Sequence, residues 1–509
     1  MKSKKYYSFI VLSGLLMALC FNIPSIAIVA WGGLIPLFYV LFKEKTSNRK
    51  AYLYMFTYGM VFYLSYMLCL IALYPLDWMG FSNGASILVV ISGIIGFSLL
   101  EAFFLGFIGL FFNIFRSKSN IVNSISMGFI WIIFEFVQGL GIMGFTGGQL
   151  AASQFLYLPL IQSVSLFGAL FVSFLIVSVN SFLLCAIVER NNRKKYSIII
   201  LIVFISNLFF GTISMSIKKY NGNVKVAVIQ GNVASGQKWE NGMTMKIYNR
   251  YMDLTKEAIK ENPEIVIWPE TAIPVDISSD DKLYKSYVKI AKEIDGLFLS
   301  GVIASEEIDG EENDFNAVIA IDKNGYIAPA YLKRHLVPFG EFIPYRSILV
   351  KIAPFVDDIA GLGDLTPGEE TNVINTNLGN IGNLICYESI FSKLARDSIR
   401  DGAQLFVVAT NDSWFEDSSA TTKHFAHSVL RAVEYDRFLV RAGNTGISSV
   451  IAPDGKQLGT IEAMEEGYLI ENVEFLHSRT LYSYIGDLIV LIGLMWILIV
   501  GIMKKKRMW

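Results

Sequence analysis

Long apolar runs alternate with short polar segments over the first 217 residues, and one more apolar run lies close to the C-terminus. Each run reaches the ~20 apolar residues that a helix needs to cross the hydrocarbon core of a bilayer. The pattern therefore predicts eight transmembrane helices, seven before the middle of the chain and one after it. The expected spans are two helices between residues 5 and 43, broken near Pro24, and residues 52–74, 86–115, 121–139, 157–188, 196–217 and 481–503.

The middle of the chain has a different pattern, in which short β-prone runs alternate with amphipathic stretches. Continuous apolar strands with helices between them are typical of an α/β sheet that is covered on its faces. The expected strands are 224–230, 264–268, 297–304, 316–322, 381–387 and 404–410, with helices near 241–261, 281–294, 391–400 and 420–435 and a closing hairpin around 452–456. We expect a membrane domain at 1–219, a globular domain at 220–476, and a last helix with a basic tail at 477–509.

The basic residues between the apolar runs predict the orientation of the chain. Seventeen Lys and Arg residues lie on one set of helix ends, near residues 2–5, 43–50, 116–118, 190–195 and 504–507. The alternate loops, near 22–32, 75–85 and 140–156, carry none. Because short cytoplasmic loops are enriched in Lys and Arg, both termini are predicted to be cytoplasmic and the globular domain to lie on the outer face.

Composition narrows the class of protein further. Hydrophobic residues make up 53% of the 509 residues and charged residues only 17%, as in membrane proteins. The net charge of −1 gives no electrostatic reason to expect a nucleic-acid partner. The four histidines and four cysteines form no zinc-ligand spacing, so neither a metal nor another cofactor is predicted.

Two acidic residues, Glu101 and Glu135, lie inside predicted spans. Ionisable residues inside a membrane are candidates for function by default. The sequence names no partner for either of them, and their role stays open at this level.

Three functional side chains lie at the ends of predicted strands in the globular domain. Glu270 follows "IVIWP", and Cys386 ends "NLIC". Lys333 lies in "YLKRHLVPFGE", eight residues before Glu341. Functional groups in α/β sheets gather where strands end, so we expect these side chains to meet.

Each of the three has an ordinary explanation by itself: a solvated loop acid, a surface charge and a packed cysteine. Together they supply a base, a cation and a nucleophile. A nearby ammonium lowers the pKa of a thiol, and a carboxylate can take its proton and return it to a leaving group. The ammonium can also stabilise the oxyanion of a tetrahedral intermediate. No histidine lies in a recognisable Cys/His motif, so a papain-like site is disfavoured.

At these residues the chain resembles the nitrilase superfamily, whose members use Glu, Lys and Cys in this order. The motifs "WPETA", "KRHLVPFGE", "CYE" and "NDSWF", with seven spans before them and one after, make the whole chain similar to the apolipoprotein N-acyltransferase family of bacterial envelopes. The resemblance implies a polytopic α-helical membrane protein with eight transmembrane helices and a nitrilase-like α-β-β-α sandwich domain.

The resemblance also assigns roles to residues at the strand ends. It implies that Glu270 is the general base, Lys333 the oxyanion stabiliser and Cys386 the acylated nucleophile. The residues that resemble the family's supporting positions are Glu341, Tyr387 and Glu388.

Four more positions resemble those that contact substrate in the family. Trp239 in "GQKWE" and Trp414 in "NDSWF" match aromatic positions near the acyl chain or the acceptor, and Arg437 matches a further sensitive position. Gly144 begins "GFTG", where the family commonly has "GFPW". The missing Pro and Trp put the contacts of that loop in doubt, although not the chemistry.

The reaction that the resemblance implies has two steps. The thiol attacks an ester of a membrane phospholipid and keeps the acyl chain as a thioester. The α-amine of a diacylglyceryl-modified N-terminal cysteine of an apolipoprotein then takes the chain. The resemblance places the protein in the bacterial cytoplasmic (inner) membrane with its catalytic domain on the periplasmic side. A monomer is expected. The apolar segment 338–363 is predicted to be a membrane-facing lid.

Two other readings remain open on the residues alone. A membrane-anchored amidase or nitrilase would use the same side chains without a lipid donor, although eight spans exceed what anchoring needs. A transporter with a degenerate outer domain would explain the acids inside the spans, but it would not need all three catalytic residue types.

Overall fold

The computed structural model describes residues 2–43, 46–76, 80–240, 242–277, 280–352, 365–370 and 373–506. Residues 353–363 of the predicted lid lie outside the described residues. The chain divides into two compact units. The membrane unit comprises Met1–Ile71, Leu88–Lys218 and Thr480–Trp509, and the sandwich unit comprises Ala72–Ile87 and Lys219–Arg479.

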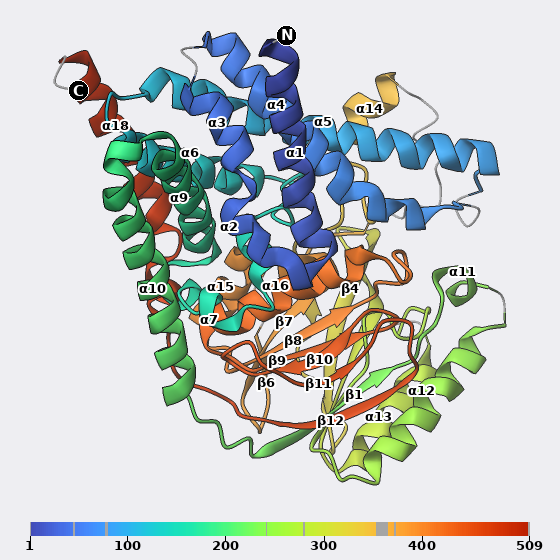
Figure 1. The fold of residues 1–509 in the computed structure, drawn as a ribbon. Coiled ribbons are helices and arrows are strands. Elements are labelled where there is room, and N and C mark those ends of the chain that lie inside the picture. The colour runs from blue at the N-terminus through green and yellow to red at the C-terminus, as the bar shows by residue number, and fades with distance from the viewer. Residues whose placement is uncertain are drawn as a thin grey trace. The chain divides into compact units, whose positions relative to one another are not determined.

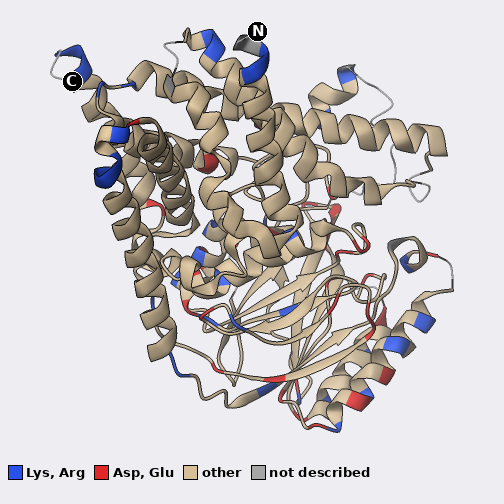
Figure 2. Ribbon diagram, in the orientation of Figure 1, with Lys and Arg blue, Asp and Glu red and all other residues tan. Residues whose placement is uncertain are grey.

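Eight helices of the described residues are long and apolar enough to cross a membrane, which confirms the predicted number. They contain α1 (Lys2–Asn22), α2 (Ala30–Gly33) with α3 (Ile35–Lys43), α4 (Asn48–Met67), α5 (Asn83–Phe115), α6 (Asn120–Gln138), α9 (Ala169–Val188), α10 (Arg193–Ile217) and α18 (Leu488–Lys505). The charged residues of these helices are mostly Lys and Arg near helix ends, whereas helices of the sandwich unit carry both signs (Figure 2).

The predicted span at 157–188 is shorter in the structure than the sequence suggested. Residues 158–167 form two single-turn helices, α7 (Leu158–Ile161) and α8 (Val164–Phe167), and the long helix α9 starts only at Ala169. Gly168 separates them with φ of +78°, a conformation that glycine adopts without the steric cost of a Cβ. A Cβ at this glycine would also lie 2.4 Å from the ring of Tyr482.

Both acids inside the spans have partners within the membrane unit. Glu101 accepts a hydrogen bond from the side-chain amide of Gln138, which also donates to the Tyr63 hydroxyl at 3.0 Å. Glu135 accepts from the backbone N–H of Leu150 at 3.1 Å. Both carboxyl groups are buried, so these contacts replace water and connect α5, α6 and the loop that follows α6.

The sandwich unit contains two six-stranded sheets. In spatial order the first has β12 (Gly467–Val473), β1 (Val224–Gln230), β2 (Ile265–Ile267), β3 (Leu297–Ile308), β4 (Glu311–Asp322) and β5 (Tyr331–Leu332). The second has β11 (Gln457–Ile461), β10 (Ser448–Ile451), β9 (Leu439–Gly443), β8 (Leu405–Thr410), β7 (Asn380–Ile385) and β6 (Ile374–Asn375). The central strands β1–β3 and β7–β9 are parallel within each sheet.

Alternating side chains of the strands build two layers of core. Val226 of the first sheet and Val407 of the second belong to one apolar cluster, which lies between the sheets. Ala227 points the other way and packs with Ile247 of α12 (Thr244–Ile259) and Tyr287 of α13 (Asp281–Ile294). The second sheet is covered by α15 (Ser392–Arg400) and α16 (Ser419–Tyr435) (Figure 1). This is an α-β-β-α sandwich, and the predicted fold class is confirmed.

Glycine lets α4 and α5 approach each other closely in the membrane unit. A Cβ at Gly109 of α5 would lie 2.1 Å from the carbonyl oxygen of Ala51 of α4. A Cβ at Gly59 of α4 would lie 2.8 Å from Cα of Ala102 of α5. Small residues commonly allow membrane helices to pack backbone against backbone in this way.

We therefore expect Gly109→Ala to lower the thermal stability of the detergent-solubilised protein, because overpacking costs about 1–3 kcal/mol. Gly93→Ala in the same helix is the matched control, since a Cβ there meets nothing within 4 Å. Thermal unfolding of both variants is the measurement. Equal midpoints for the two would show that the close approach of α4 and α5 contributes nothing to stability.

Candidate active site

Cys386 lies where β7 ends and a 3-10 turn, η7 (Cys386–Ile390), begins. Its φ is +50°, in the left-handed region that costs a residue with a Cβ roughly 1–2 kcal/mol. Strain of this kind persists only where the surroundings hold the backbone. The neighbours of Cys386 therefore hold its backbone in this conformation.

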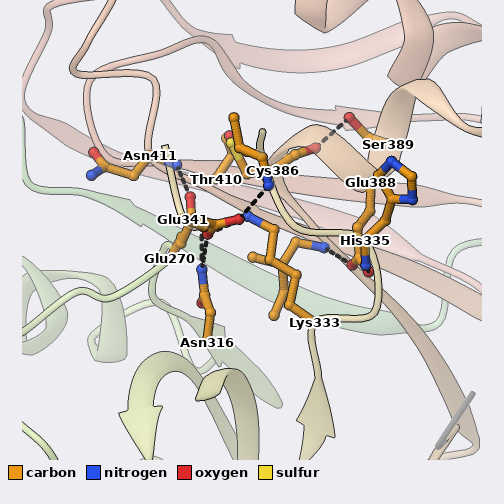
Figure 3. A network of polar contacts seen from close by, with 12 residues as sticks. Glu270, Asn316, Lys333, His335, Glu341, Cys386, Glu388, Ser389, Thr410 and Asn411 are labelled. Atoms are coloured by element: carbon orange, nitrogen blue, oxygen red, sulfur yellow. Dashed lines mark hydrogen bonds and ion pairs between the residues drawn. The ribbon is translucent and has the colours of Figure 1, made fainter. Parts of the chain in front are cut away.

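Glu270 follows β2 and is 6% exposed. Its Oε1 accepts from the amide of Asn316 at 2.7 Å and from the ammonium of Lys333 at 3.3 Å. Its Oε2 accepts from the backbone N–H of Asn411 at 2.6 Å, at the end of β8. Strand ends of both sheets thus hold this carboxylate, as Figure 3 shows.

Lys333 is 1% exposed and lies between two carboxylates. Its Nζ donates to Oε1 of Glu341 at 2.7 Å as well as to Glu270. Asn316 bridges the same two acids, because its amide also donates to Glu341 at 3.0 Å. Burial opposes a charge on Lys333, but the two carboxylates outweigh it and raise the pKa of this lysine above its ordinary value. The side chain is therefore an ammonium.

The thiol of Cys386 has a raised pKa. Removal from water raises this pKa most, and the negative charge of Glu270 raises it further, while Lys333 lowers it. The ammonium does lower the pKa of the thiol, as the sequence suggested, but the other two effects are larger. The resting site therefore holds a neutral thiol, which needs a base in order to attack.

Glu388 joins the two segments that carry the lysine and the cysteine. Its Oε1 accepts from the backbone N–H groups of Arg334 and His335 at 2.7 and 3.1 Å. Its Oε2 accepts from the N–H of Ile385 and the hydroxyl of Tyr331, both at 2.8 Å. The residue is fully buried. With four donors on two oxygens, Glu388 holds the end of β7 against the end of β5.

The other predicted positions are more dispersed. The ring of Tyr387 packs against Phe391 with centroids 5.2 Å apart. Trp239 is 57% exposed and follows the short helix α11 (Ser235–Lys238). Trp414 is half-buried in the turn after β8.

Arg437 and Gly144 have other surroundings. The guanidinium of Arg437 is buried and donates to the carbonyl oxygens of Ala403 and Asp436, both at 2.9 Å, and burial lowers its pKa to about 10. Gly144 belongs to the membrane unit, where its N–H donates to Gly141 O at 3.0 Å. Substrate contact by these two residues stays a prediction.

Sequence reasoning missed two polar residues beside the acids. Asn316 lies in an apolar strand, "NAVIAID", where nothing marked it as functional. Lys238 precedes Trp239 in "GQKWE" and is 2% exposed, with its Nζ 3.4 Å from the carbonyl oxygen of Glu270. Burial lowers the pKa of Lys238 to about 8, against the opposing effect of Glu270.

A second missed group lies behind the cysteine. Asp412 pairs with Nδ1 of His424 and with the guanidinium of Arg441, each at 2.8 Å. Nε2 of His424 lies 2.9 Å from the carbonyl oxygen of Cys386. The positive neighbours outweigh burial and hold the pKa of Asp412 below its usual range. The motif "NDSWF" and the pair of histidines in "KHFAHS" were the available signals.

The thiol, Asp412 and His424 also have the residue types of a metal site, with ligand atoms within 4.8 Å of one another. The donor set does not fit an ion well. Both oxygens of Asp412 and both ring nitrogens of His424 already have protein partners, and the cationic Arg441 lies against the carboxylate. Hydrogen bonding accounts for this cluster without a metal.

The fold and the Glu–Lys–Cys site define a domain of the nitrilase class. The carbon-nitrogen hydrolase family model matches residues 225–478, and the model of the apolipoprotein N-acyltransferase N-terminal domain matches residues 13–182. A solved structure of this class, Nit3 of Saccharomyces cerevisiae, is 19% identical and covers 50% of this chain and 92% of that one, with a TM-score of 0.38.

Relatives that match nearly the whole chain identify its family. A protein of Geobacter metallireducens called apolipoprotein N-acyltransferase is 31% identical over 496 residues, which are 95% of this chain and 92% of that protein. One of Thermotoga maritima with the same name is 30% identical and covers 88% of this chain and 83% of its own length. The chain belongs to the apolipoprotein N-acyltransferase family.

We expect Glu388→Gln to destabilise the sandwich unit by about 1–3 kcal/mol, because an amide nitrogen would face N–H donors that lose their acceptor. Urea or thermal unfolding followed by circular dichroism measures the effect. Glu306→Gln, at an exposed position of β3, is the control and should leave stability within ~0.5 kcal/mol. Equal stability of the two variants would contradict the holding role of Glu388.

Proposed function

We propose that this protein transfers an acyl chain from a membrane phospholipid, through a thioester on Cys386, to the N-terminal α-amine of a diacylglyceryl-cysteine apolipoprotein. The observation that carries the proposal is the set formed by the buried Glu270 and Lys333 and the half-buried Cys386. This set lies in a chain that has eight helices able to span a membrane and belongs to a family named for this transfer.

In the first step Glu270 takes the proton of the Cys386 thiol as the sulfur attacks the ester carbonyl carbon of the phospholipid. The ammonium of Lys333 stabilises the oxyanion that forms on the carbonyl oxygen. Collapse of the tetrahedral intermediate breaks the C–O bond of the ester, and Glu270 returns its proton to the leaving oxygen. A lysophospholipid leaves, and the acyl chain stays on sulfur.

In the second step the α-amine of the apolipoprotein attacks the thioester carbon. Glu270 now takes a proton from the amine, and the thiol is regenerated as the C–S bond breaks. The α-amine must be neutral to attack, and its ordinary pKa of about 8 makes this form available near neutral pH. The product is a triacylated lipoprotein with a new amide bond.

Glu341 supports both steps by holding the ammonium of Lys333 at 2.7 Å, so that the cation stays beside the base. Glu388 and Tyr387 act on the turn that carries the nucleophile. Trp239 is a suitable contact for lipid or acceptor because its large ring is exposed just after the short helix α11, and Trp414, half-buried after β8, is proposed for the same role. We also propose Arg437 and Gly144 as substrate contacts.

Both substrates are lipids of a membrane, and the protein is a multi-pass membrane protein. An acyl chain gains ~0.8 kcal/mol for each CH₂ that stays in an apolar environment, which favours holding the intermediate on the enzyme rather than releasing it to water. We further propose that the termini are cytoplasmic, that the sandwich unit faces the outer side of the bacterial inner membrane, and that the protein acts as a monomer. The asymmetric distribution of Lys and Arg supports the orientation.

The acyl intermediate can be tested directly. Purified protein incubated with a labelled phospholipid is expected to carry one acyl group on Cys386, seen by mass spectrometry as a thioester that hydroxylamine removes. Cys386→Ala is the control and should carry none. An equal adduct on this variant, or no adduct on the wild type with any phospholipid, would refute the thioester route.

The base can be tested in the same assay. Glu270→Gln keeps a side chain of the same size but cannot take the thiol proton, so acylation of Cys386 is expected to slow by at least about 100-fold. Circular dichroism and thermal unfolding show whether the variant is folded. A folded variant that acylates at the wild-type rate would exclude Glu270 as the base.

The proposed orientation predicts which positions an impermeant maleimide reaches in spheroplasts. Glu293→Cys, exposed on α13, is expected to react, whereas Lys118→Cys, between α5 and α6, should react only after the membrane is permeabilised. Wild-type protein measures the background from its own cysteines. Reaction of Lys118→Cys but not Glu293→Cys in intact spheroplasts would contradict the proposed orientation.

A further inference from the structure

A row of buried side chains ends on the backbone of the nucleophile. Arg441 and Asp412 are fully buried, and the guanidinium of Arg441 donates to Oδ2 of Asp412 at 2.8 Å. Oδ1 of Asp412 lies 2.8 Å from Nδ1 of His424. Nε2 of His424 then lies 2.9 Å from the carbonyl oxygen of Cys386. The row is separate from the carboxylates that flank Lys333.

The partners of His424 fix how its ring is used. A carbonyl oxygen can only accept, so Nε2 is the donor to Cys386. Nδ1 lies 2.8 Å from Oδ1 of Asp412 and 3.0 Å from a guanidinium nitrogen of Arg441. Ser389 belongs to the same arrangement: its hydroxyl donates to the carbonyl oxygen of Cys386 at 2.8 Å, and its oxygen lies 2.9 Å from Nε2 of His424. One carbonyl oxygen therefore receives two donors.

These donors act on a strained residue. The carbonyl of Cys386 belongs to the peptide that leaves the left-handed residue, so its direction sets where the turn goes and how the side chain of Cys386 is aimed. α16 holds the rest of this segment from the same side. Arg431 donates to the carbonyl oxygen of Ile390 at 3.1 Å. The hydroxyl of Tyr435 donates to the carbonyl oxygen of Ser392 at 2.7 Å.

We propose that His424, held in place by Asp412 and Arg441, is a positioning residue for Cys386. It donates to the carbonyl oxygen of the nucleophile and so keeps the left-handed turn in the geometry that aims the thiol at the substrate carbonyl and keeps it within reach of Glu270. The consequence for acyl transfer rests on the proposed function. The orientation of the thiol, however, affects every reaction of Cys386.

The test compares two variants at one position in the full-length protein in detergent. His424→Leu removes the ring donor to the carbonyl oxygen of Cys386, and His424→Gln puts an amide donor in its place. Two rates are measured at the Cys386 peptide by mass spectrometry: alkylation by iodoacetamide, and acylation by a labelled phospholipid in a single turnover. His477→Gln, at an exposed histidine that bonds to Gln404, is the matched control.

We expect His424→Leu to slow both rates by about 100-fold, the loss typical of a reacting atom misplaced by ~1 Å. His424→Gln is expected to recover about tenfold of that loss, since one hydrogen bond to the carbonyl is restored. Maximal acylation rate should fall while the phospholipid concentration at half-saturation stays the same, because His424 contacts the turn and not the lipid. The two variants should have similar thermal unfolding midpoints. A difference between their reaction rates then reports the orientation of the thiol and not the stability of the fold.

Two results would overturn the proposal. One is a folded His424→Leu protein whose Cys386 is alkylated at the wild-type rate. The other is a His424→Gln protein whose Cys386 reacts no faster than that of His424→Leu. If His424→Leu does not fold, Ser389→Ala decides, because it removes the other donor to the same carbonyl; slower alkylation supports the proposal and an unchanged rate refutes it. If wild-type protein alkylates Cys386 but never acylates it, the proposed acyl transfer fails, while the alkylation rates still decide the role of His424.

Discussion

The site depends on one buried ion cluster, in which the ammonium of Lys333 lies between the carboxylates of Glu270 and Glu341. Charges removed from water are costly unless each has a partner of opposite sign and its remaining donors and acceptors are hydrogen-bonded. The amide of Asn316 and the backbone N–H of Asn411 supply those additional bonds. The donors and acceptors come from both sheets, so the sandwich must be assembled before the cluster is satisfied. The packing of the two sheets therefore also sets the catalytic geometry.

The charge of this cluster also explains the state of the thiol. Lys333, Glu270 and Glu341 together carry one net negative charge, and a resting thiolate would add a second in a place poorly screened by water. The raised pKa of Cys386 is the expression of that penalty. In the proposed reaction the thiol proton moves to Glu270 as the oxyanion forms beside Lys333, so the net charge of the site stays the same during the attack. A buried site can stabilise such a shift of charge far better than the creation of a new one.

The sequence predicted the scaffold well where periodicity and strand ends carry the signal. Strands β1, β7 and β8 fall close to their expected residues because their apolar runs are continuous and bounded by polar turns. Helices α13 and α16, expected from amphipathic stretches, also fall close to their expected residues. The meeting of Glu270, Lys333 and Cys386 was expected because each lies at a strand end. Glu270 and Cys386 follow β2 and β7, which belong to different sheets, and Lys333 follows β5, which is antiparallel to β4. Strand β9, "LVRAG", was not predicted, because a buried arginine and a glycine interrupt its apolar pattern. Its Arg441 is buried only because Asp412, from another strand end, neutralises it, and such pairing across the fold is invisible in one sequence. Asn316 was missed for the same reason.

Glu388 and His424 share a feature that no local sequence pattern expresses: both act on backbone groups of the segment that holds Cys386. Glu388 binds the N–H of Ile385 just before the cysteine, and His424 binds the carbonyl of the cysteine itself. The left-handed conformation of Cys386 is strained and would relax if its neighbours were free to move. Fixing the N–H of the residue before it and its own carbonyl opposes that relaxation from both sides. Glu388 also accepts from the N–H groups of Arg334 and His335 after β5 of the other sheet, whereas His424 belongs to α16. The nucleophile is thus aimed by the two halves of the sandwich together, which ties its geometry to the same assembly that satisfies the ion cluster.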